Sequence, residues 1–237
     1  MKNPKVSIII PFYNCRYVQQ AIRSALTQSY ANKEVIVVND GSTQYTDNIK
    51  PFLNQITYIE KKNGGTASAL NAGIRVATGK YFSWLSSDDK FVTDKTLIQI
   101  RFMQKQNANV SYTNYHVIND KSQIIRKNVG KCIYDKKAFY EYLKNKCHIN
   151  GCTVIMKMEL FDKVGLFNEK LSYTQDYDMW LRVLQHDDFH FLNKPLLLSR
   201  YHRDMGTLKY LDKAKIEKEH VSKKYESTLN EKIRNLN

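Results

Sequence analysis

The segment Lys80-Tyr-Phe-Ser-Trp-Leu-Ser-Ser-Asp-Asp89 decides how this chain folds and what its first half does. Its apolar part, 81–85, is short and rich in aromatic residues, which is typical of an interior strand. The strand ends in two hydroxyls and the carboxylates of Asp88 and Asp89. Adjacent carboxylates that lose water repel each other, so they need a positive partner. A Mg²⁺ or Mn²⁺ ion that also binds substrate phosphates meets that need, and a solvated helix cap is the alternative.

The composition of the 237 residues fits one large folded domain, with or without an appendage. Hydrophobic residues make up 42% and aromatic residues 12%, which is enough for a substantial core. The four cysteines follow no zinc-binding spacing and are too few for a disulfide scaffold, so we expect a cytoplasmic protein. The apolar run at 6–10 is too short for a signal peptide, and no run reaches the ~18 apolar residues of a membrane span.

The charge of the chain is basic and uneven. The 37 Lys and Arg residues exceed the 23 Asp and Glu residues, which gives a net charge of +14. Residues 121–150, called the basic block below, hold eight Lys or Arg against Asp135 and Glu141, a local net charge of +6. This block favours an anionic partner, such as a nucleic acid, a membrane surface or a phosphorylated substrate. A solvated face that keeps the protein soluble is the alternative.

The first ninety residues alternate between apolar segments and helical patterns. Segments rich in β-branched residues at 6–10, 34–38 and 57–60 precede the strand at 81–85, and the weakest helical pattern lies at 45–53. This alternation predicts an α/β fold with a parallel sheet and right-handed crossovers. Ligands of such sheets bind beyond the carboxyl ends of the strands. The binding-type and turn residues at four such ends are Pro11, Phe12, Tyr13, Asp40, Asn63, Gly64, Asp88 and Asp89.

The second half of the chain predicts mixed elements. Strands are expected at 110–118, 154–157 and 195–202, and helices at 96–106, 135–143, 159–164 and from 173 onward. Asp176 lies in the first turn of the last helix, where a carboxylate is favoured as a cap or is available for chemistry. Asp178 lies two residues further along this helix, so its side chain is expected to point roughly to the opposite side.

We expect a domain at 1–208, divided into halves at 1–93 and 94–208, and a terminal helix at 209–237. In the terminal segment apolar residues recur every four positions, at Val221, Tyr225, Leu229 and Ile233. This spacing predicts an amphipathic helix. Its apolar face is expected to pack on the domain, on a membrane surface or on a partner chain, as in a homo-oligomer.

The ordered set of these segments resembles the family 2 glycosyltransferases, which are inverting nucleotide-sugar enzymes with the GT-A fold. Val6-Ser-Ile-Ile-Ile-Pro-Phe-Tyr-Asn14 is similar to the opening strand of that family, and Val38-Asn-Asp-Gly-Ser42 to its uracil-contacting turn. Asn63 to Gly73 resembles its Asn-Gly-Gly segment with the following Asn-x-Gly, and 86–89 stand at its Asp-x-Asp position. The segments at 164–169 and 175–182 look like its acceptor-side pair, and Arg200-Tyr-His202 like its Arg-x-His. The resemblance covers about residues 5–203.

The resemblance implies a metal-dependent, inverting transfer of a sugar from a nucleoside diphosphate sugar, UDP-linked, to an acceptor hydroxyl in surface polysaccharide or glycoconjugate assembly. The donor residues that it implies are Pro11, Phe12, Tyr13, Asp40, Asn63, Gly64, Asn71, Ser87 and Asp88. It assigns Mn²⁺ or Mg²⁺ to Asp88 with Asp89 and His202, and the general base to Asp176. The basic block beside the second half then predicts an anionic acceptor, such as a lipid-pyrophosphate-linked saccharide, reached by peripheral contact at the inner membrane face.

Three residues depart from the family pattern. Ser86 replaces the first Asp of Asp-x-Asp, so metal binding rests on Asp88. Gln175 stands where a Glu usually precedes the base, which puts a supporting contact in doubt. Leu70 replaces an Arg that often precedes Asn71, so a phosphate or ribose contact is missing.

Three other functions compete with this interpretation. A nucleotidyltransferase would carry a Gly-rich loop with a Lys after the first strand, where this chain has Pro-Phe-Tyr-Asn. A nucleic-acid-binding module would use the basic block with its aromatic residues, Tyr134, Phe139, Tyr140 and Tyr142. Those aromatic residues suit a helix that packs on the core, so we expect no nucleic-acid partner. The third alternative is an inactive transferase fold, since Ser86 and Gln175 replace family carboxylates.

Overall fold

A computed structural model describes residues 3–203, 205 and 210–236. Its first half contains four parallel strands in the order β3-β2-β1-β4, as the alternating pattern predicts. The strands are β1 (Val6–Phe12), β2 (Lys33–Asp40), β3 (Thr57–Lys61) and β4 (Tyr81–Trp84). Ile8, Ile9 and Ile10 of β1 are fully buried, which is expected for a central parallel strand with both faces covered.

Two helices connect these strands, α1 (Val18–Leu26) after β1 and α2 (Gly65–Val76) after β3. The prediction of a single helix at 45–53 is wrong. Two short 3₁₀ helices, η1 (Thr46–Asn48) and η2 (Lys50–Phe52), occupy this stretch. Tyr45 has a positive φ of 62° and Pro51 lacks a backbone donor, so a continuous helix cannot form across the segment.

The second half extends the same sheet with β5 (Lys90–Phe91), β6 (Val110–Ile118), β7 (Ile124–Arg126), β8 (Ile155–Lys157) and β9 (Phe189–Arg200). The order continues from β4 as β8-β6-β9-β5, with β7 beside β6. Because β5 pairs with β9, residues on either side of the predicted division at 93/94 share one sheet.

The ninth strand begins at Phe189, six residues before the predicted start at Pro195. Its first residues pair with β6 up to Thr113, and the register shifts where Asn114 meets Pro195. A proline at an irregularity is compatible with a strand because no ladder hydrogen bond is lost there. The strand ends at Arg200, so His202 follows it rather than lying within it.

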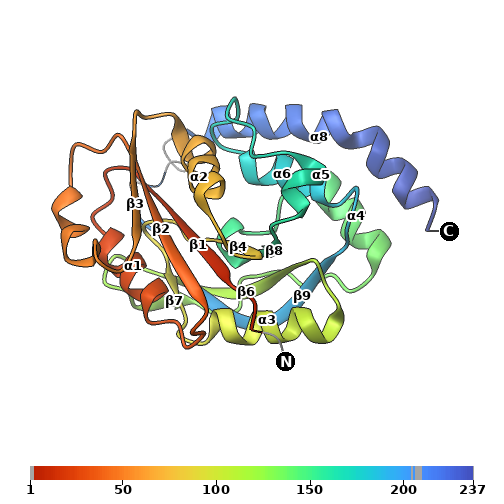
Figure 1. Cartoon of the computed structure of the whole chain (residues 1–237). Helices are drawn as coiled ribbons and strands as arrows, with labels where there is room; N and C mark the ends of the chain where they lie inside the picture. Colours follow the sequence, from red (N-terminus) through yellow and green to blue (C-terminus); the bar gives the residue numbers. More distant parts are fainter. Residues whose placement is uncertain (1–2, 204, 206–209, 237) are drawn as a thin grey trace.

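The remaining helices are α3 (Lys95–Gln106), α4 (Lys136–Asn145), α5 (Leu160–Val164), α6 (Gln175–Val183) and α8 (Leu211–Arg234), with a 3₁₀ turn η3 (Gly151–Thr153) before β8. Figure 1 shows α3 on one side of the molecule and α8 on the opposite side, alongside α6 and α4. None of the helices in the described ranges is long and apolar enough to cross a membrane.

The apolar face of α8 packs on the chain itself. Val221, Tyr225 and Leu229 are buried, Ile233 lies against the core, and α8 contacts both α4 and α6. The apolar face was expected to pack on the domain, on a membrane surface or on a partner chain, and in the structure it packs on the domain. The homo-oligomer predicted through the helix finds no support here, since its apolar surface is covered.

Candidate functional site

The loops after β1 and β2 are joined by the side chain of Asn14. Its Oδ1 accepts hydrogen bonds from the backbone amides of Thr43 and Gln44 at 2.8 and 2.9 Å, and its own amide donates to Ser42 Oγ at 3.1 Å. Asn14 has a positive φ of 46°, a conformation that asparagine tolerates better than most residues. The two strand ends therefore form one continuous surface.

The donor residues predicted at the end of β1 differ in their exposure. Tyr13 is 54% exposed and faces solvent, Pro11 is half-buried, and the side chain of Phe12 is fully buried. Tyr13 thus has a side chain free to contact a ligand. The contribution of Phe12 is to the core, and its carbonyl accepts a hydrogen bond from Ser42 Oγ at 3.3 Å.

Asp40 lies at the end of β2 and is held by groups from two other elements. One carboxylate oxygen accepts from Lys61 Nζ at 2.7 Å and from the Gly64 amide at 3.0 Å. The other accepts from the Gly65 amide, where α2 begins, at 2.8 Å. The side chain of Asn63 donates to the Asp40 carbonyl at 2.9 Å. The structure thus brings Asp40, Asn63 and Gly64 together, as the strand-end argument predicts, at a helix N-terminus that favours an anion.

Lys61 is a residue that the sequence reasoning missed. It ends β3 and pairs in register with Asp40 of the neighbouring parallel strand. The signal was present, because equal positions at the ends of adjacent parallel strands lie side by side. The Asp40 carboxylate is 4% exposed, so the ammonium group offsets a buried charge.

Asp88 and His202 meet although they come from distant parts of the chain. His202 Nε2 lies 3.1 Å from Asp88 Oδ2. The ring of His202 packs edge-on against Tyr17, with ring centroids 5.4 Å apart. His202 Nδ1 is buried and has no protein partner among the described residues. Two of the three predicted metal ligands thus form a close pair of one carboxylate and one imidazole.

Arg200 fixes the position of this pair. Its side chain is 1% exposed, and it donates to the carbonyls of Asp88 and Asn119 at 2.8 Å each and to Gln20 Oε1 at 2.9 Å. Its guanidinium also lies over the ring of Tyr17, 4.2 Å from the centroid. Through these hydrogen bonds, the buried side chain of Arg200 connects the end of β9 to the segment after β4.

Asp89 contacts the backbone of the strand that precedes His202. Its carboxyl accepts from the Arg200 amide at 2.7 Å and is buried. Burial and the nearby charge of Asp88 raise the pKa of Asp89 well above its usual range, although hydrogen bonds from Arg200, Cys152 and Ser199 oppose that shift. The contact with the backbone of Arg200 gives Asp89 a structural role, and metal binding by Asp89 stays a prediction.

Ser86 and Ser87, the adjacent serines of the segment 80–89, each contact a cysteine. Ser86 donates its amide to Cys152 Sγ and accepts from that thiol through Oγ, both at 3.2 Å. Ser87 hydrogen bonds to Cys15. Burial and the charge of Asp88 raise the pKa of Cys15 to about 11, against the hydrogen bond from Ser87. Burial likewise raises the pKa of Cys152. Both thiols are therefore protonated, and they pack beside the Asp88 site rather than act as nucleophiles.

Asn71, predicted to contact the donor, connects the two halves of the domain. Its Oδ1 accepts from the Phe167 amide at 2.9 Å, and its Nδ2 donates to the Phe167 carbonyl at 2.9 Å and to Glu169 at 2.8 Å. Asn71 is 2% exposed. These contacts use its amide to hold the segment before α6, so a direct contact with a donor stays a prediction.

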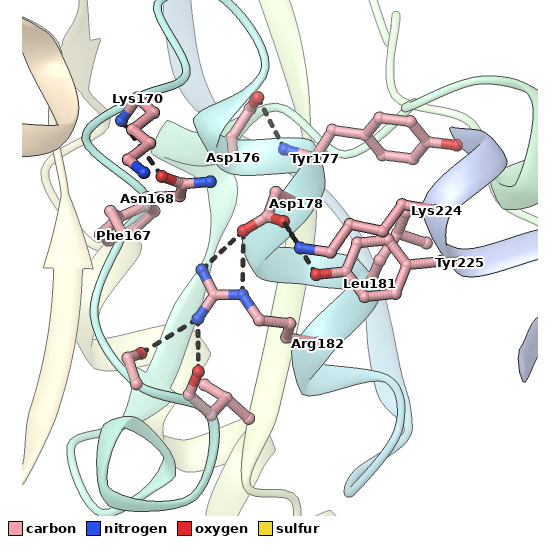
Figure 2. A network of polar contacts seen from close by, with 12 residues as sticks. Phe167, Asn168, Lys170, Asp176, Tyr177, Asp178, Leu181, Arg182, Lys224 and Tyr225 are labelled. Carbon is pink, nitrogen blue, oxygen red and sulfur yellow. Dashed lines mark hydrogen bonds and ion pairs between the residues drawn. The ribbon is translucent and has the colours of Figure 1, made fainter. Parts of the chain in front are cut away.

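Asp176 opens α6, as predicted. Figure 2 shows its carboxylate turned to the Tyr177 amide, which donates to it at 2.8 Å. Burial raises the pKa of Asp176 to about 6, although the amides of Tyr177 and Asp176 itself lower it, and the charge of Glu217 raises it further. A carboxylate with such a pKa accepts a proton near neutral pH, which suits a general base.

Asp178 faces away from Asp176 and toward α8, which confirms the prediction of opposite sides (Figure 2). Its carboxylate forms an ion pair with Arg182 at 2.8 Å and accepts from the Tyr225 hydroxyl at 2.8 Å. Lys224 Nζ lies 3.4 Å away from the same carboxylate. Asp178 is 2% exposed, and its carboxylate is occupied by these structural contacts.

Gln175 precedes Asp176 at the start of α6 and is buried. Its side-chain Oε1 has no hydrogen-bond partner in the part of the chain that the structure describes.

The model of the family described as Glycosyl transferase family 2 matches residues 7–165. The chain belongs to this family. This family 2 domain is 41% identical over 211 residues to an uncharacterized glycosyltransferase of Rickettsia prowazekii, with 86% of this chain and 66% of that protein covered. It is 30% identical over 213 residues to the UDP-Glc:alpha-D-GlcNAc-diphosphoundecaprenol beta-1,3-glucosyltransferase WfgD of Escherichia coli, with 86% and 79% covered.

Among solved structures, the family 2 domain resembles TarS of S. aureus. The TM-score is 0.69 at 19% identity for TarS residues 1–349 with UDP, with 83% of this chain and 60% of that chain covered. The corresponding complex with UDP-GlcNAc gives a TM-score of 0.70. The predicted GT-A Rossmann-like fold is thereby confirmed. The chain spans between 31% and 66% of the length of five Rickettsia relatives, all of which are named uncharacterized glycosyltransferases.

Proposed function

We propose that this domain transfers a sugar from a UDP-linked donor to a hydroxyl of a lipid-linked, anionic saccharide, with inversion at the anomeric carbon. The close pair of Asp88, which follows β4, and His202, which follows β9, is the observation that carries this proposal, because a carboxylate beside an imidazole supports binding of a divalent cation. TarS, which shares the fold, was crystallised with UDP and with UDP-GlcNAc. The relative WfgD is named for a UDP-Glc donor and a diphosphoundecaprenol acceptor.

The donor nucleotide would lie on the Asp40 surface. An ionised carboxylate has about four acceptor sites, and three of those of Asp40 are taken by Lys61, Gly64 and Gly65. The remaining site can accept the N3–H of uracil, whereas the N3 of cytosine is itself an acceptor. Tyr13, half-exposed at the end of β1, is placed to contact the same nucleotide.

Asp88 and His202 fit a divalent cation whose coordination shell is completed by substrate phosphates and water. Among the described residues no three His, Cys, Asp or Glu side chains cluster as a metal site. Mg²⁺ and Mn²⁺ are commonly held by few protein groups together with substrate phosphates and water, so two ligands are sufficient. The bound cation would neutralise charge on the diphosphate leaving group.

Asp176 would act as the general base. Its carboxylate takes the proton of the acceptor hydroxyl while that oxygen forms a bond to the anomeric carbon. The bond from this carbon to the diphosphate oxygen breaks, and UDP leaves with that electron pair. One such displacement inverts the anomeric centre.

The acceptor would be anionic because the basic block borders this half of the domain. Lys121, Arg126, Lys127 and Lys131 of that block are exposed. Such a surface favours a lipid diphosphate at the inner face of a membrane, where the protein would bind peripherally from the cytoplasm. The nucleic-acid alternative is weakened, since Phe139 and Tyr140 are buried in the core and cannot stack on bases.

The experiment is a screen of nucleotide sugars for hydrolysis and transfer, with and without Mn²⁺, alongside UDP and CDP binding. We expect a UDP-sugar to be used, and Mn²⁺ to raise the affinity for UDP by about tenfold or more, as expected when a metal joins protein and diphosphate. The Asp88→Asn variant should lose that enhancement. The exposed carboxylate Asp162 provides a control, Asp162→Asn, that should keep it. An equal metal effect in Asp88→Asn, or equal binding of CDP by the wild type, contradicts the proposal.

A further inference from the structure

Glu217 of α8 binds the turn that leads into α6. Its Oε1 accepts from the backbone amides of Tyr173 and Thr174 at 2.8 Å each and from the Thr174 hydroxyl at 2.7 Å. Its Oε2 accepts from the Ser172 amide at 2.9 Å. One carboxylate thus collects four donors from three consecutive residues.

This turn has the form of an anion site. Successive backbone amides that point to one side create a concavity that binds phosphates and other anions in many proteins. Here the anion is a side chain of the same chain. Burial by itself would raise the pKa of Glu217, but the hydrogen bonds from Ser172, Thr174 and Tyr173 outweigh it and lower the pKa. Glu217 is therefore charged when it holds the turn.

The hydroxyl of Thr174 binds Glu217 in place of capping its own helix. Thr174 is the N-cap residue of α6, where a threonine hydroxyl usually accepts from its own helix. In this chain the hydroxyl makes no such cap bond and donates to Glu217 instead. The start of α6 is thus fixed from outside, by α8.

The rest of α8 keeps Glu217 in place. Two turns further along, the Tyr225 hydroxyl donates to Asp178 of α6, and Lys224 lies beside the same carboxylate. Val221 and Leu229 are buried against the domain. Figure 2 shows Lys224 and Tyr225 approaching α6 on the side of Asp178, while Asp176 lies at the start of the helix.

We propose that Glu217 is a positioning residue for the transfer reaction, which holds the 172–174 turn so that Asp176, two residues later, meets the acceptor hydroxyl in reactive geometry. The inference rests on the proposed function of Asp176 as the base. The carboxylate of Asp176 is otherwise oriented by the backbone amide of Tyr177 in the same first turn, so a shift of the turn moves the base with it. A misplacement of about 1 Å at a reacting group can cost about 10²-fold in rate.

The test compares Glu217→Gln with Glu219→Gln, a control on an exposed position of the same helix. For both variants kcat, KM for donor and acceptor, UDP affinity, Tm and the pH profile of kcat are measured. We expect Glu217→Gln to lower kcat by about tenfold or more and to leave UDP affinity unchanged. The acidic limb of its profile should also move to lower pH, because a negative charge near Asp176 is removed. The thiol of Cys147 also interacts with Asp176, and it is protonated because burial and the Asp176 charge raise its pKa. Glu219→Gln should match the wild type in every measurement.

A second pair of variants examines the same contact from the turn. Thr174→Val removes the hydroxyl that donates to Glu217, and Thr174→Ser keeps it. We expect Thr174→Val to lower kcat less than Glu217→Gln does, and Thr174→Ser to restore it. This pair keeps the idea testable even when Glu217→Gln does not fold.

The outcomes separate the two proposals. When Asp176→Asn is inactive but Glu217→Gln and Thr174→Val keep wild-type kcat and pH profile, the role of Glu217 is refuted and the base assignment stands. When UDP affinity and Tm fall in step with kcat in both variants, Glu217 supports the fold in general and the inference is also wrong. When Asp176→Asn keeps near-wild-type turnover, the base assignment fails, and the role of Glu217 fails with it.

Discussion

Asp40 and Asp176 are the two carboxylates that the proposed function assigns to the donor and to the acceptor, and their surroundings differ. Asp40 has a lysine and two amides within 3.0 Å, all from residues 61–65 at the next strand end and the helix after it. Asp176 accepts from the amide of Tyr177, and its turn depends on Glu217 of α8. A carboxylate with a fixed cationic partner is suited to binding as an anion. Asp176 is partly buried and has no cationic partner among the described residues, so it is suited to accepting a proton.

The largest effect that separates the two carboxylates is expected from Asp176→Asn. The amide keeps the shape of the side chain but cannot take a proton, so kcat should fall by ~10²-fold or more while UDP affinity stays nearly unchanged. In the wild type, kcat should rise with pH through about 6, because burial raises the pKa of Asp176 to about 6 and only the ionised form is a base. The measurement is steady-state kinetics from pH 5 to 8 together with UDP titration. A loss of UDP binding in step with activity would place Asp176 at the donor instead.

The next effect is on stability and concerns Asp178. This residue is 2% exposed and pairs with Arg182 and the Tyr225 hydroxyl. Removing one partner of a buried ion pair leaves the other charge uncompensated, so Asp178→Asn should lower the free energy of unfolding by roughly 3 kcal/mol. Thermal and denaturant unfolding measure this change, with Asp162→Asn as the exposed control. Asp178→Asn should retain kcat well below its Tm. A selective loss of kcat with unchanged stability would instead make Asp178 the base.

The smallest effect is expected at the Asp40 surface. Lys61→Met keeps the length of the side chain but removes the ammonium group that pairs with Asp40. The remaining amides still bind the carboxylate, so UDP affinity should change by only about threefold, the scale of 0.5–1 kcal/mol. The preference for UDP over CDP should persist. Calorimetric titration of both nucleotides checks this, with the neighbouring exposed Lys62→Met as the control. A complete loss of UDP binding would show that Lys61 contacts the nucleotide directly.

The sequence could predict those parts of the fold that depend on neighbouring strands. Apolar segments that alternate with helical spacing predict the parallel order of β1 to β4, and the carboxyl ends of these strands collect Asp40, Asn63 and Gly64 as expected. The start of β9 escaped prediction because Phe189 to Leu192 are only partly buried, Asn193 and Lys194 are exposed, and the six residues carry no clear alternation. Their strand conformation comes from pairing with β6, which is a tertiary contact.

Within the candidate site, tertiary contacts again set the limit. The pairing of Asp88 with His202 followed from resemblance, since no local pattern joins residues so far apart. The hydrogen bonds of Arg200 to the segment after β4 and the four hydrogen bonds that Glu217 accepts were not predicted, because each depends on where a distant element packs. Asp89 was expected to bind metal from its adjacency to Asp88. Adjacent residues after a strand point in different directions, and Asp89 turns to the backbone of Arg200.

The position of Glu217 in the chain has a consequence for biosynthesis. Translation delivers residues in order, so Tyr13, Asp40, Asp88 and Asp176 leave the ribosome before Glu217 does. A nascent chain that ends before α8 already contains the strand ends proposed to bind the nucleotide. It still lacks the carboxylate that fixes the turn at 172–174. Under the proposed role of Glu217, nucleotide binding is therefore expected to mature earlier than sugar transfer, which awaits synthesis of α8.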